Sequence, residues 1–310
     1  MKAMAAEKKT LLKKEQMSKG VIYKALSGFY YVASDGKDIT CRARGKFRKD
    51  NNAPLVGDLV EISLNSETEG NIEKILPRKN SFIRPQVANV DQLIIIASAA
   101  IPITDPFLID RIATISVFNS CEPIVCINKK DIDPADELYS IYKNSGFKTV
   151  LTSAETGEGI EELRQCLKGK ISVFTGNSGV GKSSILNRLS PKFNIKTAEV
   201  SQKLGRGKHT TRHIELYELE DDTFVADTPG FSSFDMDILN ETNASEIQNA
   251  YREFEPYIGK CKFLDCVHLK EKGCAVVEAV KNGHISKTRH ENYMRLYEMA
   301  KSVKEWEIKK

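Results

Sequence analysis

A glycine-rich segment from Gly176 to Ser183 constrains the fold of this chain more than any other feature. It reads Gly-Asn-Ser-Gly-Val-Gly-Lys-Ser and fits the pattern GxxxxGK[ST]. An apolar run at 171–174 precedes it, and helical spacing begins at Lys182. A strand, a glycine-rich turn and a helix in this order bind phosphate, because glycines allow backbone amides to turn toward its oxygens. The segment therefore predicts a nucleotide-binding domain.

Each position of this phosphate loop has an expected role. Lys182 should contact the β- and γ-phosphates, and the Ser183 hydroxyl should bind Mg²⁺. The remaining positions should contact the nucleotide through their backbone: Gly176, Asn177, Ser178, Gly179, Val180 and Gly181.

A motif that selects guanine, Asn128-Lys129-Lys130-Asp131, comes before the phosphate loop, whereas most GTPases have the reverse order. The carboxylate of Asp131 can accept both the N1–H and the exocyclic amine of guanine, and adenine offers no such pair of donors. Asn128 should tie this loop to its neighbours, and the stem of Lys129 can lie along the base. Ser153 and Ala154 follow the next expected strand, where a backbone N–H can meet the guanine carbonyl. The two motifs together predict a GTPase with a rotated motif order.

The Mg²⁺ side of the site is expected at Asp227-Thr228-Pro229-Gly230, which follows an apolar run. Asp227 should hold the ion, through water, and the Gly230 amide should sense the γ-phosphate. A glycine-rich loop lies between the two phosphate motifs, and a threonine there can close over Mg²⁺ when the γ-phosphate is present. Thr211 is the first choice for this threonine and Thr210 is the second.

The residue after Gly230 is Phe231, where many GTPases have the glutamine that orients the attacking water. An apolar ring cannot orient water, so slow intrinsic hydrolysis is expected. His209 is the candidate for the missing group, and the alternative is that it is an exposed histidine without a catalytic role.

The fold class expected is α/β, with a circularly permuted P-loop GTPase domain at residues 81–240. Strands alternating with helices there imply a doubly wound sheet. Short strands separated by turn signals at 20–80 predict an N-terminal OB-fold β-barrel. Residues 1–19 form a basic tail, and 241–310 a small helical zinc-binding domain. The expected strands are 21–23, 28–33, 38–43, 58–64, 71–76, 92–97, 123–127, 149–152, 171–174, 214–219 and 224–226, and the expected helices of the GTPase domain are 107–118, 135–144, 159–167 and 182–189.

A cysteine cluster in the last expected domain has the spacing of a metal site: Cys261, Cys266, His268 and Cys274. Three thiolates and one imidazole complete a tetrahedral zinc site without an open position, so the ion should be structural. Inert buried thiols and redox chemistry are the alternatives. His284 and His290 lie farther along the chain and are expected on a basic surface.

Charge and composition bear on the partners. The net charge of +4 equals the charge of the first twenty residues. These contain two acidic residues, Glu7 and Glu15, and six lysines: Lys2, Lys8, Lys9, Lys13, Lys14 and Lys19. The barrel has a second basic run, residues 42–49, beside the aromatic residues Phe29, Tyr30, Tyr31 and Phe47. Bases could stack on these rings while the cations hold phosphates; alternatively, the rings fill the barrel and the cations are solvated. No apolar run is long enough for a membrane span, and the N-terminus lacks a secretory core, so a cytoplasmic protein is expected.

These residues resemble the RsgA family, the circularly permuted GTPases of small ribosomal subunit biogenesis, which are also called the YjeQ/YloQ type. The resemblance includes the basic segment 41–49 with 54–58, the connector 84–91, the rotated motifs, the triplet 209–211 and the cysteine cluster. It implies an OB barrel, a permuted GTPase domain and a zinc domain. It also implies binding to the small ribosomal subunit and its rRNA late in maturation, with GTPase activity stimulated by the subunit.

The resemblance carries the family's nucleotide contacts over to Asn128–Asp131 and to Gly176–Ser184, which adds Ser184 to the site. It carries the zinc ligands over to the four residues of the cysteine cluster and the proposed catalytic histidine to His209. Arg212 stands where many members have a third threonine, which leaves the choice between Thr210 and Thr211 open.

Three functions follow from these observations. The leading one is a monomeric GTP-driven assembly factor that binds the small ribosomal subunit and hydrolyses GTP to GDP and phosphate. The second is a GTP-gated RNA-binding module in which hydrolysis is incidental. The third is a small-molecule phosphotransferase, which needs an acceptor pocket and a base that the sequence does not clearly supply.

Overall fold

The computed structural model describes residues 17–45, 47, 53–193, 214–220, 222–228 and 243–308, without the side chains of Lys192 and of the residues after Ser302. The chain divides into two compact units. The first contains the residues up to Asn89 and a short segment that ends at Leu216, and the second contains the rest of the chain.

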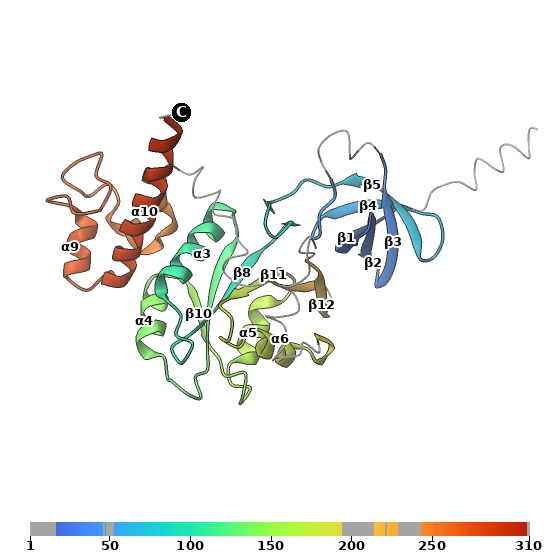
Figure 1. Ribbon diagram of the computed structural model, residues 1–310, viewed down its shortest axis with the longest axis horizontal. Coiled ribbons are helices and arrows are strands. Elements are labelled where there is room, and N and C mark those ends of the chain that lie inside the picture. Colours follow the sequence, from blue (N-terminus) through green and yellow to red (C-terminus); the bar gives the residue numbers. More distant parts are fainter. Residues whose placement is uncertain are drawn as a thin grey trace, which may run out of the picture. The chain divides into compact units, whose positions relative to one another are not determined.

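The first unit is a closed five-stranded barrel (Figure 1). Its strands are β1 (Met17–Leu26), β2 (Phe29–Ser34), β3 (Lys37–Ala43), β4 (Leu59–Leu64) and β5 (Glu69–Ile75). They are hydrogen-bonded in the order β1-β2-β3-β5-β4, and β1 pairs with β4 to close the barrel. Only the β3–β5 pair is parallel among these strands. This order confirms the OB-fold expectation.

The barrel core is mainly aliphatic. Alternate residues point inward and are fully or almost fully buried: Ile22, Val32, Ile39, Cys41, Val60, Ile62 and Ile72. The aromatic rings of Phe29, Tyr30 and Tyr31 are half-buried and do not belong to this core, whereas Phe47 is buried. Three of the four rings expected near the basic run are therefore partly open to solvent, and the fourth is not.

A buried ion pair holds the segment that leaves the barrel. Asp58 is fully buried, and Arg78 donates to its two carboxylate oxygens from Nε at 2.7 Å and from Nη2 at 2.8 Å. The Leu55 amide donates to the same carboxylate at 2.7 Å. Two short strands follow, β6 (Ser81–Phe82) and β7 (Val87–Ala88), which pair with each other.

The second unit is built on a six-stranded sheet in the order β10-β9-β8-β11-β13-β12. Its strands are β8 (Gln92–Ser98), β9 (Glu122–Asn128), β10 (Lys148–Leu151), β11 (Ile171–Gly176), β12 (Leu216–Glu220) and β13 (Thr223–Asp227). The pairs from β10 to β13 are all parallel. The strand of the phosphate loop, β11, lies between β8 and β13 and is buried along its whole length.

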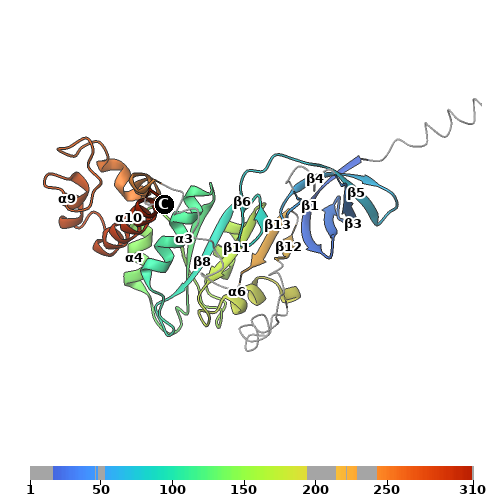
Figure 2. The same ribbon diagram turned by 45° about the horizontal axis from the view of Figure 1, so that its top comes forward.

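Helices cover both faces of this sheet, which confirms the doubly wound arrangement (Figures 1 and 2). α3 (Pro106–Phe118) and α4 (Asp136–Asn144) lie on one face, and α5 (Ile160–Leu167) and α6 (Lys182–Leu189) on the other. Alternate strand residues, among them Ile94, Cys126 and Phe174, pack against Leu163 and Ile185 of α5 and α6. The apolar strand runs and the helical spacing therefore placed these elements correctly.

The C-terminal part packs against α3. It consists of the 3₁₀ helices η3 (Ala244–Ala250) and η4 (Arg252–Tyr257), then α9 (Ala275–Lys281) and α10 (Lys287–Ile308). α10 and η3 contact α3, and Figure 2 shows α10 beside it. α3 is buried on most sides because the sheet covers one side and these helices another. No helix in the described ranges is long and apolar enough to cross a membrane.

Candidate nucleotide site and metal centre

Two glycines of the phosphate loop stand where a side chain has no room. A Cβ on Gly176 would lie 2.6 Å from the Ile96 carbonyl oxygen, and a Cβ on Gly181 would lie 2.2 Å from Nδ2 of Asn128. Gly181 also has a φ of +95°, which L-residues rarely adopt. The loop can therefore turn close to β8 and to the guanine motif only because these residues are glycine.

Asn128 joins the phosphate loop to the loops that are expected to bind the base. Its side chain is 3% exposed, and its Nδ2 donates to the Val180 carbonyl at 2.9 Å. Its Oδ1 accepts from the Ala154 amide at 3.0 Å and from the Thr152 hydroxyl at 3.3 Å. One buried amide group thus holds together the ends of β9 and β10 and the phosphate loop.

Asp131 is exposed, and its carboxylate is oriented by Ser153. The Ser153 hydroxyl donates to Oδ1 of Asp131 at 2.6 Å and accepts from the Thr156 amide at 3.0 Å. The lysines of the motif point elsewhere in this structure: Lys129 donates to the Ile101 carbonyl at 2.6 Å, and Lys130 pairs with Glu158.

Lys182 and Asp227 contact each other across the ends of neighbouring strands. β11 and β13 pair in parallel with Phe174 opposite Asp227, which brings both phosphate motifs to one edge of the sheet. The Lys182 ammonium is paired with the Asp227 carboxylate and donates to the Thr228 carbonyl at 2.6 Å. Burial raises the pKa of Asp227, and the ammonium of Lys182 opposes that rise. Thr228 is a contact that the sequence did not reveal, since its role depends on its backbone.

The other expected residues of this site divide into two groups. Ser183 and Ser184 lie half-buried in the first turn of α6, beside Lys182. His209, Thr210, Thr211 and Gly230 lie outside the described residues. A carboxylate and a hydroxyl beside a phosphate loop are the oxygen ligands that Mg²⁺ prefers, so Asp227 and Ser183 fit the expected ion.

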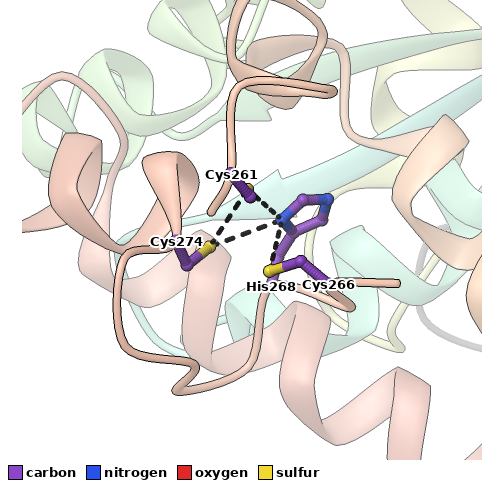
Figure 3. A group of neighbouring side chains, drawn as sticks. All are labelled: Cys261, Cys266, His268 and Cys274. Carbon is purple, nitrogen blue, oxygen red and sulfur yellow. Dashed lines mark hydrogen bonds between the residues drawn. The ribbon is translucent and has the colours of Figure 1, made fainter. Parts of the chain in front are cut away.

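The cysteine cluster is the second candidate site (Figure 3). Cys261, Cys266, His268 and Cys274 point toward one another, and their ligand atoms all lie within 4.8 Å. Nδ1 of His268 lies 3.4, 3.5 and 3.6 Å from the sulfurs of Cys274, Cys261 and Cys266. The sulfurs of Cys261 and Cys274 are 3.8 Å apart. A tetrahedral zinc ion with ordinary bond lengths requires about 3.5 Å for N···S and about 3.8 Å for S···S. The cluster therefore has the dimensions of a zinc site.

Neighbouring groups orient the ligands. The amides of Ala275 and Val277 donate to the sulfurs of Cys261 and Cys274 at 3.3 and 3.5 Å. Burial raises the pKa of Cys266 to about 12 and also raises the pKa of Cys274, so thiolates at these positions need a cation beside them.

Two residues of α10 hold the loop that carries His268. Nε2 of His290 donates to the His268 carbonyl, and the Tyr293 hydroxyl donates to the Val267 carbonyl, each at 2.7 Å. The expectation of a surface position for His290 is wrong: it is 6% exposed and supports the loop of the cysteine cluster, because α10 folds back on that loop. His284 is exposed. A long separation along the chain hid the contact of His290 from sequence reasoning.

Comparison with known proteins covers nearly the whole chain. The model of the RsgA N-terminal domain matches residues 19–72, and that of the RsgA GTPase matches residues 75–237. A relative from Caldanaerobacter subterraneus subsp. tengcongensis, "Small ribosomal subunit biogenesis GTPase RsgA", is 48% identical over 89% of this chain and 94% of its own. One of the same name from a Geobacillus strain is 46% identical over 93% of this chain and 99% of its own.

Two solved structures share the fold. YjeQ from Thermotoga maritima has a TM-score of 0.78 and 36% identity, and covers 92% of this chain with 98% of its own. YloQ, described as a circularly permuted GTPase, has a TM-score of 0.77 and 34% identity, and covers 94% of this chain with 97% of its own. The rotated motif order, the barrel and the extent of these matches lead to one conclusion: the chain belongs to the RsgA family of circularly permuted GTPases.

Proposed function

We propose that this GTPase acts in the maturation of the small ribosomal subunit, binds that subunit through its rRNA, and hydrolyses GTP to GDP and phosphate faster when bound. The observation that carries the proposal is the full-length match to relatives named for small ribosomal subunit biogenesis, which spans the barrel as well as the GTPase domain. We further propose that it works as a monomer in the cytoplasm.

The barrel supports the RNA part of the proposal. The guanidinium of Arg42 lies 4.8 Å from the ring centre of Phe29, and the ammonium of Lys24 lies 6.0 Å from that of Tyr31. These half-buried rings offer bases a stacking surface, and Arg42 offers phosphates a counter-charge, whereas Lys24 is paired with Glu215 at 2.9 Å. Phe47 is buried and takes no part.

GTP turnover with and without purified small ribosomal subunits, at two salt concentrations, tests the proposal. Turnover should rise on adding subunits at low salt, and the rise should diminish steeply at high salt, because phosphate contacts release counterions. Unchanged turnover at both concentrations would contradict it. Subunit binding that depends on GTP without any rise in turnover would instead favour the GTP-gated RNA-binding module.

In the nucleotide site, Asp131 reads the base, Lys182 binds the phosphates, and Ser183, Asp227 and a threonine at 210 or 211 hold Mg²⁺. Gly230 senses the γ-phosphate and His209 orients the attacking water. The contacts of Asn128 and Ser153 support the assignment of the base loop, because they hold Asp131 and the Ala154 segment on the same side as the phosphate loop.

Asp131→Asn should change the base that the protein prefers. The amide of asparagine keeps one acceptor and adds a donor. The donor can hydrogen-bond to the 2-carbonyl of xanthine, whereas the 2-amine of guanine is itself a donor and cannot accept from it. GTP affinity should fall about 100-fold, or about 3 kcal/mol, and XTP should now bind better than GTP. Equilibrium competition between the two nucleotides measures the change. The matched control is Asp136→Asn in the exposed first turn of α4, which should leave affinity unchanged; an unaltered preference in Asp131→Asn would refute the base site.

We further propose that the cysteine cluster holds one structural zinc ion. Removal of the ion by a chelator should unfold the loop from Cys261 to Cys274, since zinc binding in such clusters contributes about 10 kcal/mol or more. Elemental analysis should find one zinc per chain. Cys266→Ser should lose the zinc and, with it, part of the near-ultraviolet circular dichroism signal. Cys166→Ser, a half-exposed thiol outside the cluster, serves as the control. Protein that is produced in zinc-supplemented medium and contains no zinc would contradict the proposal.

A further inference from the structure

Arg188 connects the helix of the phosphate loop to the loop expected to read the guanine carbonyl. It lies in the last turn of α6, the helix that begins at Lys182. Its Nε donates to the Ala154 carbonyl at 2.7 Å, and its Nη2 donates to the Glu155 carbonyl. The two nitrogens of one planar guanidinium thus hold two successive peptide carbonyls in a fixed geometry, which the single ammonium nitrogen of lysine does not provide.

This contact determines the direction of an amide. The N–H of a trans peptide points opposite to the C=O of the same plane, so holding the Ala154 carbonyl orients the Glu155 N–H. On the other side of Ala154, its own N–H donates to Oδ1 of Asn128 at 3.0 Å. The residues after Ser153 are therefore held from two sides, by Asn128 from β9 and by Arg188 from α6.

The carbonyl at position 6 of guanine is the group that a backbone N–H in this loop can recognise, since adenine has an amine there. Asp131 reads the neighbouring groups on the same edge of the base, the N1–H and the 2-amine. Recognition of the 6-carbonyl and of the N1–H and 2-amine therefore depends on different restraints: Ser153 orients Asp131, whereas Arg188 orients the peptides that follow Ala154.

Resting on the base site of the proposed function, we propose that Arg188 is a positioning residue for guanine specificity, acting on the 6-carbonyl through the Ala154–Glu155 peptides. It does not touch the nucleotide. Its effect is to keep the Glu155 N–H oriented toward the 6-carbonyl oxygen of guanine. This contact favours guanine over purines without an acceptor at position 6.

The test compares two affinity ratios in Arg188→Met, a variant that keeps an unbranched side chain as far as the position of Nε and loses both donors. The GTP/6-thio-GTP ratio reports the contact to position 6, because sulfur is a weak acceptor. The GTP/ITP ratio reports the 2-amine that Asp131 binds. The first ratio should fall about 5-fold or more, the effect of about one hydrogen bond, while the second ratio stays unchanged. Arg188→Lys should give an intermediate first ratio.

Arg164→Met is the matched control. The guanidinium of Arg164 also donates to a carbonyl at the end of α6, that of Leu189. Among the described residues, it makes no hydrogen bond to residues 153–155. Equal changes in both ratios, or the same change in Arg164→Met, would overturn the proposal, since they indicate a general loosening of α6. An unchanged first ratio in Arg188→Met would also overturn it. Failure of the base site itself shows separately, as a GTP/ITP ratio that Asp131→Asn leaves intact.

Discussion

Replacing Arg289 with methionine is expected to destabilise the second unit by about 3–5 kcal/mol, because the change leaves buried carboxylates without their cation. Arg289 is 1% exposed, and its partners Asp110 and Glu253 are 0% and 5% exposed. Its Nη1 donates to Asp110 at 2.5 Å and its Nε to Glu253 at 2.7 Å. Asn292 donates to the second oxygen of Asp110 at 2.6 Å.

The pairing joins α10 and η4 to α3, so its loss should separate the C-terminal helices from the sheet. The guanidinium also lies 4.3 Å from the ring centre of Tyr251, a contact that methionine replaces only by apolar packing. Denaturant unfolding followed by circular dichroism should show a lower midpoint. Arg252→Met is the control, because its pair with Glu122 is 37% and 42% exposed and should contribute at most about 1 kcal/mol.

The loss in Arg289→Met should depend on pH. Burial already raises the pKa of Asp110, and Arg289 is the main group that opposes this rise. Without Arg289 the folded pKa rises further above the unfolded value, so the folded state binds more protons and stability falls as pH rises through that interval. The gap to wild type should therefore narrow on acidification. An equal gap at neutral and acidic pH, or no change in midpoint, would show that the network carries little of the stability.

Lys182→Met is expected to lower GTP turnover at saturating nucleotide by about 100- to 1000-fold, as for the loss of one electrostatic contact to the transition state. The ammonium is paired with Asp227 and Thr228 in this structure, so it must exchange these partners for phosphate oxygens when GTP binds. Its removal should also raise the pKa of Asp227 further, which weakens Mg²⁺ binding by that carboxylate.

Single-turnover hydrolysis at saturating Mg²⁺ separates the two effects, because added metal restores only the second. Lys170→Met is the control: Lys170 precedes the opposite end of β11 and donates to the Gln92 side chain. Turnover within about twofold of wild type in Lys182→Met would remove Lys182 from the catalytic groups, since a lost transition-state contact has a much larger effect.

The strands of the sheet and the helices that cover it were predictable because each has its own periodicity and a turn signal at its end. In the barrel, β1 was predicted too short, since it extends from Met17 to Leu26 and the apolar run at 21–23 covers only its middle. Its polar first half, from Met17 to Val21, pairs with β4 to close the barrel, and closure is a property of two strands that lie far apart in the chain.

The sequence by itself predicted the phosphate loop, the guanine motif and the cysteine cluster, because each lies within a short stretch whose spacing alone brings the groups together. Only the tertiary structure decided which partners Asn128, Arg188, His290 and Arg289 have. These side chains act on residues distant in the sequence, and the choice among many possible partners is made by packing. A buried polar group must be paired, but the fold alone determines with what.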